Sequence, residues 1–239
     1  MRIGIDVREF CIDKHTGIRF ILENFIAHAR IMRKHEFVLF GNQFTDFHSL
    51  AGKHKEVILP EKNTILWDQF QLPRALKKEK VDIFYSPYIK TPFLRVCPYV
   101  NTICDILPLS IPKHRGLKAF LEKIYFYVYS YLCGRRSVNV VTLSEDARKK
   151  VARIFRISPK KLKVVYPPVD IPKEGRKTKE WESKIVDEYD LFRPYFLYLG
   201  NFKKHKNLLN LIAAYDVLSD EVKNDYKLML VGGSPEEVQ

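Results

Sequence analysis

The sequence contains one short loop whose residue types suit the binding of a phosphate anion. Four basic residues, Lys203–Lys206 (KKHK), stand between an apolar run that ends at Gly200 and a helical pattern that begins near Asn207. Positive charge at a helix N-terminus opposes the helix dipole, and it becomes favourable when an anion lies between the two. A diphosphate is such an anion, because backbone amides at a helix start also point toward it. The spacing therefore favours a diphosphate site here, and a solvated basic loop is the alternative.

Three other loops with candidate chemistry each follow a predicted strand, where ligands bind in open α/β folds. Gly17 opens a helix, and a glycine at a helix start lets a phosphate approach the backbone amides. The segment Tyr85–Pro92 (YSPYIKTP) offers hydroxyls and flat rings that suit a sugar. Asp105 follows an apolar run, where a carboxylate could orient a hydroxyl or accept a proton. Each feature also has a purely structural explanation. The loop before Gly17 could be a plain strand–helix turn, and Tyr85–Pro92 a rigid proline connection. Asp105 could be a loop cap or an ion-pair partner.

Cysteine spacing and the absence of long apolar runs exclude several classes of protein. The four cysteines form no CxxC pair, so we expect reduced thiols rather than a disulfide framework or a zinc site. Cys104 has no basic group beside it in the sequence, which favours an inert buried thiol over a nucleophile. The start, MRIGIDVREF, lacks the apolar core of a signal peptide, and no run approaches the ~18 apolar residues of a membrane span. These features predict a cytoplasmic protein without a metal site.

The hydrophobic pattern predicts the strands and helices that must position these loops. Strands are expected at Ile3–Val7, Phe37–Phe40, Val57–Leu59, Val81–Tyr85, Tyr99–Ile103, Val138–Leu143, Lys163–Tyr166, Tyr195–Leu199 and Tyr226–Val231. Helices are expected at Gly17–Arg33, at Trp67–Lys80 with a break or kink at Pro73, at Leu117–Leu132, after a Ser144 cap, and at Asn207–Leu218. Near-continuous apolar strands that alternate with helices predict an α/β fold, with a parallel sheet covered by helices on both faces.

Proline and charge patterns divide the chain. The segment Pro167–Pro172 (PPVDIP) ends the first block, and the charged, apolar-poor run Lys173–Glu182 is typical of a linker. We expect a Rossmann-like domain at residues 1–170, a linker at 171–190, and the start of a second Rossmann-like domain at 191–239. The second block has too few strands to bury a parallel sheet. We therefore expect the front part of a longer architecture, a separately encoded partner, or a shortened relative.

The positive charge is concentrated in one part of the chain. The 239 residues carry a net charge of +13, and residues 113–163 alone hold 14 Lys and Arg against three Asp and Glu, a net charge of +11. This block surrounds the aromatic helix Leu117–Cys133. The residues expected to face a membrane or an anion are Lys118 and Lys123 within that helix and Arg135 and Arg136 just after it. The pattern favours an anionic membrane surface or a phosphate-bearing lipid over nucleic acid, for which no motif is present. For the helix itself, burial on two faces is the alternative.

Five segments, taken in order, resemble the family 4 (group 1) glycosyltransferases of the GT-B fold. They are IGIDVREF…HTGIRF, WDQFQLPRAL…VDIFYSPY, VNTICDILPL, VVTLSEDARKKVARIFRISPKKLKVVYPPVD and FLYLGNFKKHKNLLNLIAAY. The resemblance implies two Rossmann-like domains, of which the first takes an acceptor and the second binds a nucleotide-sugar. It also implies sugar transfer with retention of the anomeric configuration, with no obligatory metal and no cofactor, the nucleotide-sugar being a substrate.

The resemblance assigns roles to individual positions. It implies a donor diphosphate site at Gly17, Gly200, His205 and Lys206, with His205 in place of the family's arginine. It implies acceptor binding in the first domain, for which the candidates are Tyr85, Ser86 and Tyr88. Asp105 is kept as a candidate catalytic residue, whereas Cys104 stands where the family has a histidine. The paired-glutamate segment that holds the donor ribose and sugar has no counterpart before Gln239.

The sequence thus leads to one main hypothesis and two alternatives. The main hypothesis is a retaining glycosyltransferase that moves a sugar from a nucleotide-sugar to a glycan or lipid-linked acceptor in envelope polysaccharide synthesis. As given, this chain is expected to need the remainder of a donor domain, from the same or a separate chain, and to lie at the inner face of the membrane. The first alternative is a non-catalytic membrane- or partner-binding module derived from an acceptor domain. The second, a nucleic-acid binder, rests on charge alone.

Overall fold

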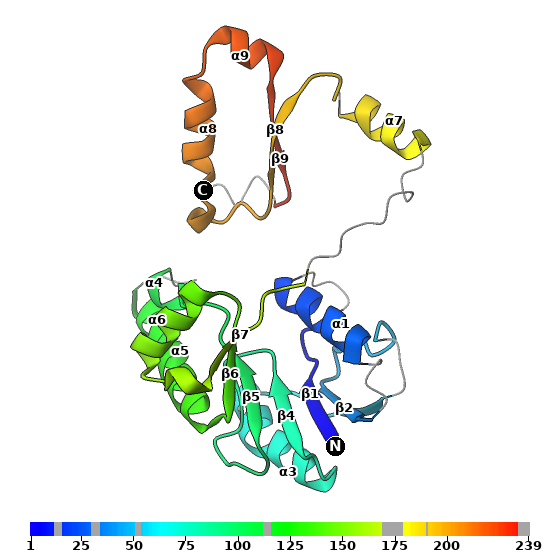
Figure 1. Cartoon of the computed structure of the whole chain (residues 1–239), viewed down its shortest axis with the longest axis vertical. Helices are drawn as coiled ribbons and strands as arrows, with labels where there is room; N and C mark the ends of the chain where they lie inside the picture. The colour runs from blue at the N-terminus through cyan, green and yellow to red at the C-terminus, as the bar shows by residue number, and fades with distance from the viewer. Residues whose placement is uncertain are drawn as a thin grey trace. The chain divides into compact units, whose positions relative to one another are not determined.

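The computed structural model describes residues 1–11, 16–29, 34–50, 54–111, 116–168, 179–189 and 191–233. The chain divides into two units, Met1–Val169 and Asp170–Gln239, which are considered separately (Figure 1). Residues 12–15 of the expected first loop, 30–33 of the expected first helix and 171–178 of the expected linker lie outside the described residues.

Unit 1 contains a seven-stranded sheet in which every strand pairing is parallel. Its strands are β1 (Arg2–Asp6), β2 (Glu36–Gly41), β3 (Lys55–Ile58), β4 (Ile83–Ser86), β5 (Tyr99–Thr102), β6 (Asn139–Thr142) and β7 (Leu162–Val164). Each strand predicted in this part of the chain is present, with ends that differ by up to two residues. The spatial order is β3-β2-β1-β4-β5-β6-β7. This arrangement confirms the predicted Rossmann-like α/β class.

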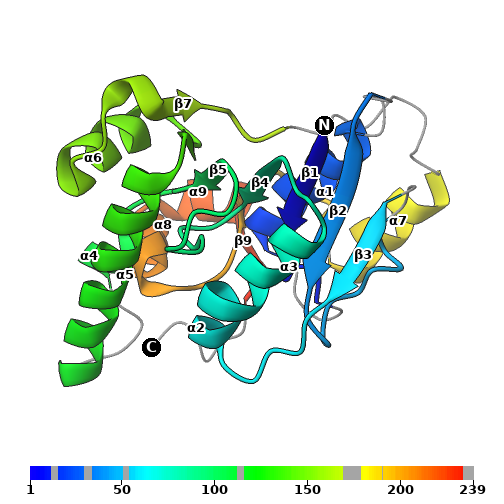
Figure 2. The ribbon, with the colours of Figure 1, turned by 90° about the horizontal axis from the view of Figure 1, so that it is seen from below.

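Helices cover both faces of this sheet, because successive side chains of a strand point to opposite sides. In β2, Val38 and Phe40 pack in one apolar cluster with Leu76, whereas Leu39 packs in another with Leu22. A third cluster lies beneath the helix that ends at Phe155. Figure 2 shows these layers from below. The helical elements are α1 (Gly17–Ala29), α2 (Thr64–Leu66), a π-helical turn (Trp67–Gln71), α3 (Leu72–Lys78), α4 (Leu107–Ser110), α5 (Gly116–Arg136), α6 (Glu145–Phe155) and a 3₁₀ turn (Pro159–Lys161).

The helix predicted at Trp67–Lys80 differs from the expectation at both its start and its proline. It begins three residues earlier, because the Asn63 side chain caps the backbone amides of residues 65 and 66. It also continues through Pro73, since the preceding turn widens and the Leu72 N–H donates to the Trp67 carbonyl, five residues back. A proline ring clashes with the carbonyl four residues before it, and the wide turn removes that clash. The expected break or kink thus takes the form of a π-helical turn at residues 67–71.

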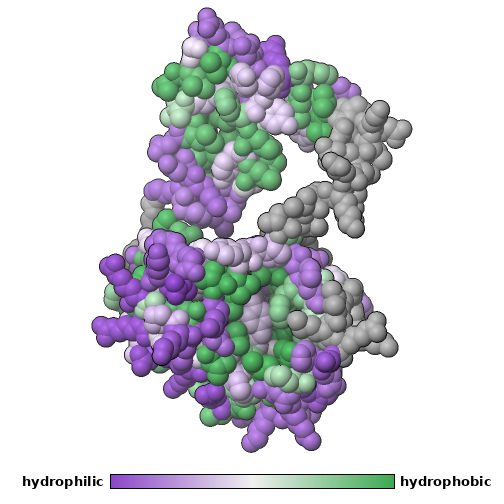
Figure 3. Space-filling model, in the orientation of Figure 1, coloured by the Kyte–Doolittle hydropathy of each residue, from purple (hydrophilic) through white to green (hydrophobic). Residues whose placement is uncertain are grey.

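Unit 2 is built on two parallel strands, β8 (Tyr195–Leu199) and β9 (Lys227–Val231). Its helical elements are α7 (Lys179–Glu188), a 3₁₀ turn (Lys204–Lys206), α8 (Leu208–Asp216) and α9 (Asp220–Asp225). Helix α7 lies inside the segment expected to be a linker, because the Lys and Glu residues that suggested a linker are also good helix formers. Apolar side chains of β8 and α8 remain at the surface, among them Leu199 and Leu209, as the green areas of this unit show (Figure 3).

Candidate functional site

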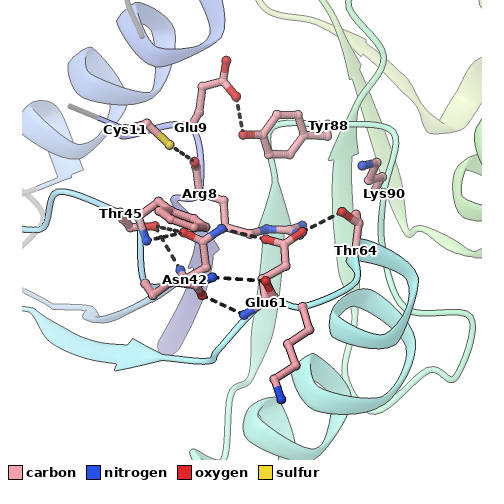
Figure 4. A pocket seen from close by; sticks show the side chains of 12 residues that line it. Arg8, Glu9, Cys11, Asn42, Thr45, Glu61, Thr64, Tyr88 and Lys90 are labelled. Carbon is pink, nitrogen blue, oxygen red and sulfur yellow. Dashed lines mark hydrogen bonds and ion pairs between the residues drawn. The ribbon is translucent and has the colours of Figure 1, made fainter. Parts of the chain in front are cut away.

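A pocket of about 860 Å³ opens where four neighbouring strands of unit 1 end. Each strand is followed by a loop that contributes to its wall: Glu9 follows β1, Asn42 follows β2, Glu61 follows β3 and Tyr88 follows β4 (Figure 4). The carboxyl ends of parallel strands meet at one edge of the sheet, which is where such folds bind ligands. The pocket is therefore the candidate acceptor site of unit 1.

The floor of this region is a buried cluster of charges centred on Arg8. One terminal nitrogen of Arg8 lies 2.7 Å from a carboxylate oxygen of Asp6 and 2.7 Å from one of Asp68, and the other lies 3.5 Å from Glu61. The guanidinium carbon is 3.6 Å from the ring centre of Trp67. The side chains of Asp6 and Asp68 are each 1% exposed and that of Arg8 is 8% exposed. A planar guanidinium can satisfy several buried carboxylates at once, so the cluster fixes the loops after β1 and β3 against the π-helical turn.

Burial and pairing shift the acid–base behaviour of this cluster. Burial disfavours the charged form of Asp68 and raises its pKa to about 6, with the charge of Arg8 opposing and that of Asp6 reinforcing the shift. Burial also acts to raise the pKa of Glu61, but hydrogen bonds from Thr64 and Asn42, with the charge of Arg8, outweigh it and leave that pKa lowered. Burial acts to lower the pKa of Arg8, and the carboxylates reverse this and raise it. Arg8 therefore stays charged and holds the cluster together.

A second group of hydrogen bonds links the pocket to the start of α1. The Tyr88 hydroxyl donates to Glu9 over 2.8 Å, and the Thr16 hydroxyl donates to the other oxygen of the same carboxylate over 2.5 Å. Burial, followed by the negative charges of Asp6 and Glu9, raises the pKa of Tyr88 above its ordinary value. Tyr88 therefore remains a neutral hydroxyl at the pocket wall, where it can donate or accept a hydrogen bond.

The other two candidate acceptor residues lie elsewhere. Ser86 is buried at the end of β4, where its hydroxyl lies 3.4 Å from the Tyr88 amide that donates to it. The Tyr85 hydroxyl lies 3.0 Å from that of Thr102, and its ring packs against Phe25 of α1. Of the three candidates, the pocket wall includes Tyr88. The other two tie β4 to its surroundings.

Cys104 and Asp105 lie at a separate, smaller pocket of about 250 Å³ after β5. The Asp105 carboxylate accepts from the Leu107 amide over 2.9 Å, which forms a local turn just before α4. Burial, reinforced by the charge of Asp105, raises the pKa of Cys104 to about 11. This thiol is therefore protonated at neutral pH, which fits the expectation of an inert cysteine.

Gly17 is the first residue of α1, after Thr16, whose side chain accepts from the Arg19 amide. A side chain at position 17 would meet no atom within 4 Å in the described structure. The fold of unit 1 therefore does not itself require glycine at this position.

The basic loop belongs to unit 2. The four side chains of Lys203–Lys206 are exposed, and none forms an ion pair with a residue that the structure describes. Asn207 adopts a left-handed conformation with φ of 58° and joins the loop to α8. Gly200, with φ of 158°, ends β8 and donates its amide to Val231. Gly200, His205 and Lys206 thus lie in one strand–loop–helix connection, and Gly17 belongs to unit 1.

The described ranges contain neither a metal-binding cluster nor a membrane-spanning helix. No group of three or more His, Cys, Asp and Glu side chains there could hold a metal ion. Within the same ranges, no helix is long and apolar enough to cross a membrane. The cysteines Cys11, Cys97, Cys104 and Cys133 are all free.

Comparison with known proteins identifies the class. Two structures of Anabaena Alr3699/HepE, one with UDP and glucose and one with UDP-glucose, align with 98% of this chain at TM-scores of 0.60 and 0.58 and 15% and 14% identity. The chain covers 61% and 70% of those proteins. Its fold is that of the GT-B glycosyltransferases.

A match to a family model shows which family the chain belongs to. The model of Glycosyltransferase Family 4 matches residues 17–173, and the chain belongs to that family. A curated relative, the O-antigen chain mannosyltransferase RfbU of Salmonella typhimurium, is 27% identical over 132 residues. That match covers 55% of this chain and 31% of the relative.

Proposed function

We propose that this chain supplies the acceptor-binding unit and part of the donor-binding unit of a retaining, metal-independent glycosyltransferase. The observation that carries the proposal is the polar pocket at the carboxyl edge of the unit 1 sheet, in a chain that belongs to Glycosyltransferase Family 4. The donor is a nucleotide-sugar, and the acceptor is a glycan or a lipid-linked glycan of an envelope polysaccharide. The relative named as an O-antigen chain mannosyltransferase supports this class of product.

In the proposed reaction, an acceptor hydroxyl in the pocket attacks C1 of the donor sugar on the face that the nucleotide leaves. The bond from C1 to the acceptor oxygen forms, the bond from C1 to the diphosphate oxygen breaks, and the hydroxyl proton passes to the leaving diphosphate. Lys206 and His205 neutralise the charge that develops on this diphosphate, which is an electrostatic role. Gly17 and Gly200 allow the backbone to approach the phosphates, and Tyr88 orients the acceptor.

Transfer from a radiolabelled donor tests this proposal. The chain, co-expressed with a polypeptide that supplies the remainder of a donor domain, is incubated with UDP-glucose or GDP-mannose and with lipid extract as acceptor. We expect label in the lipid fraction and an α-linked product from an α-linked donor, as read by the anomeric NMR coupling. Hydrolysis and transfer that both stay at background with either donor would overturn it.

A non-catalytic module derived from an acceptor domain is the second candidate. The observation that favours it is Cys104, a protonated thiol at the position where the family has histidine. Such a module would bind membranes or partners without turnover. Restoring the histidine by Cys104→His separates the two: a catalytic chain keeps or gains transfer, whereas a module stays inactive in both forms. For either candidate we propose a peripheral location at the inner face of the membrane, which the basic block at residues 113–163 supports.

A further inference from the structure

Helix α5 exposes its apolar stripe instead of burying it. Leu117, Phe120, Leu121, Ile124 and Val128 recur at helical spacing and are 73%, 60%, 55%, 43% and 40% exposed, respectively. Surface helices normally turn such a stripe toward the core. An exposed apolar patch of this kind marks a place where another surface binds.

The buried residues of the same helix lie nearer its C-terminal end and do not belong to this stripe. Tyr129, Ser130, Cys133 and Gly134 are the residues of α5 that are buried. Figure 2 shows α5 running along one side of unit 1. The preceding helix α4 and its C-terminal neighbour add Leu107 and Ile111, which are 39% and 44% exposed. We call these seven exposed side chains of residues 107, 111, 117, 120, 121, 124 and 128 the α4–α5 surface.

Beyond the C-terminal end of the apolar stripe, the surface of unit 1 becomes basic. Arg135 follows Tyr131 by one helical turn, and its guanidinium carbon lies 5.3 Å from the centre of that ring. Two adjoining hollows, of about 430 and 620 Å³, share Arg135 and Lys161 in their walls. Their cationic lining residues are Arg95, Arg135, Arg136, Arg156 and Lys161, and neither hollow has an acidic residue in its wall.

These cations are held in place but not neutralised. The Lys161 ammonium donates to the carbonyls of Arg135 and Ser137 over 2.6 and 3.0 Å, at the C-terminus of α5. Arg135 donates to the Arg156 carbonyl over 3.5 Å. Within the part of the chain that the structure describes, none of the five forms an ion pair. The hollows are therefore suited to phosphate groups, which accept several charge-assisted hydrogen bonds.

We propose that unit 1 docks on an anionic lipid bilayer through the α4–α5 surface, with its apolar side chains among the acyl chains and the two basic hollows on headgroup phosphates. The positive charge of this part of unit 1 favours an anionic bilayer over other binding partners. A second copy of the chain would bring two blocks of net charge +11 together, and nucleic acid offers no continuous apolar layer for Phe120 and Leu121. A surface that pairs an apolar stripe with cations is typical of interfacial membrane binding. This inference deepens the peripheral location proposed above and does not depend on transfer activity.

Vesicle co-sedimentation of the full chain tests the docking. Phosphatidylcholine vesicles with and without phosphatidylglycerol are compared, with no donor or acceptor present. The intact chain should bind the anionic vesicles and bind the neutral ones far more weakly. Phe120→Ser combined with Leu121→Ser should weaken binding by tenfold or more, and Arg135→Gln combined with Arg136→Gln should weaken it by about twenty-fivefold, near fivefold for each charge.

Two matched controls alter exposed residues elsewhere. Val217→Ser removes an exposed apolar side chain of unit 2, and Lys77→Gln combined with Lys78→Gln removes two exposed cations of α3. Both should leave vesicle binding unchanged. Failure of the intact chain to bind anionic vesicles would overturn the proposal, as would equal losses in control and test variants. Loss of self-association in the Phe120 variant with vesicle binding intact would instead assign the surface to a second copy. Transfer to a soluble acceptor, measured on the same variants, reports the proposed function independently.

Discussion

Charged side chains cluster in two regions of this molecule, buried in one and exposed in the other. Around Arg8, the guanidinium is almost fully buried and contacts three carboxylates, those of Asp6, Asp68 and Glu61. In the loop Lys203–Lys206, all four basic side chains are exposed, and none has an acidic partner among the described residues. The charges around Arg8 are paired with one another inside the fold, whereas the charges of the basic loop face solvent.

The difference follows from solvation. A buried charge loses its water and must be satisfied by the protein, whereas an exposed cation keeps its hydration until a ligand replaces it. The Arg8 cluster therefore positions the loops of the candidate acceptor pocket and is expected to act on stability. The basic loop costs the fold little and is expected to act on binding. Substitutions in the Arg8 cluster should therefore change stability, and substitutions in the basic loop should change ligand binding.

The largest expected effect is that of Arg8→Met, which leaves two buried carboxylates without a cation. We expect unit 1 to lose about 3–5 kcal/mol of unfolding free energy, the typical cost of breaking a buried ion pair from one side. Urea denaturation followed by Trp67 fluorescence, in a Trp181→Phe background, measures the loss. Arg74→Met, which removes an exposed arginine of α3, should change stability by less than about 0.5 kcal/mol. Equal effects of the two variants would contradict the structural role of the cluster.

Asp68 gives the cluster a pH dependence of its own. Its pKa is about 6 in the folded chain, against about 3.9 for an unfolded aspartate, so between these values the folded state holds a proton that the unfolded state has lost. The contribution of Asp68 to stability is therefore fully present below pH ~4 and is lost as the pH rises through about 6. Asp68→Asn carries no such proton, so its stability relative to the parent should rise by about 2 kcal/mol from pH 4 to pH 7. Urea denaturation at the two pH values measures this difference, and a constant difference would mean that Asp68 does not titrate in this range.

Much of the fold of unit 1 follows from sequence pattern, because its strands are nearly continuous apolar runs. The alternation of Val38, Leu39 and Phe40 between the two faces of β2 is what a covered parallel sheet requires. Pattern failed where a local signal has two structural solutions. Pro73 indicated a break or kink, and the chain accommodates it with a π-helical turn at residues 67–71, which the pattern did not specify. The charged run Lys173–Glu182 indicated a linker, and its last four residues belong to α7.

The candidate site was harder to predict because its key contacts join residues far apart in the chain. Arg8 contacts Asp68, which lies 60 residues further along the chain, and no short-range sequence pattern predicts that pair. The only available signal was that DVREF and WDQF both occur in segments that resemble family motifs. The orientation of α5 was undetermined for a related reason. Its two faces are both partly apolar, so packing against neighbours, rather than periodicity, decides which one is exposed.

In the exposed region, Lys206→Met should weaken nucleotide binding and leave stability unchanged. Loss of one charge-assisted contact to a diphosphate corresponds to about a tenfold increase in the dissociation constant for UDP or GDP. Titration calorimetry measures the affinity, and thermal unfolding should show no shift, because the side chain has no partner in the described structure. Lys184→Met, an exposed lysine of α7, is the matched control and should bind like the parent. A stability loss without a change in affinity would place Lys206 with the structural charges.

Tyr88 lies between the two kinds of region, because its hydroxyl is paired with Glu9 and also lines the pocket. Tyr88→Phe should cost about 1 kcal/mol of unfolding free energy, the typical value for one hydrogen bond, since Glu9 keeps the Thr16 hydroxyl as a donor and is not left unsatisfied. Urea denaturation measures the loss, and Tyr166→Phe, at a tyrosine that is 69% exposed, should cost nothing measurable. If Tyr88→Phe is equally neutral, the hydroxyl contributes nothing to the fold. It would then belong with the charges of the basic loop, as a group that the protein holds for a ligand.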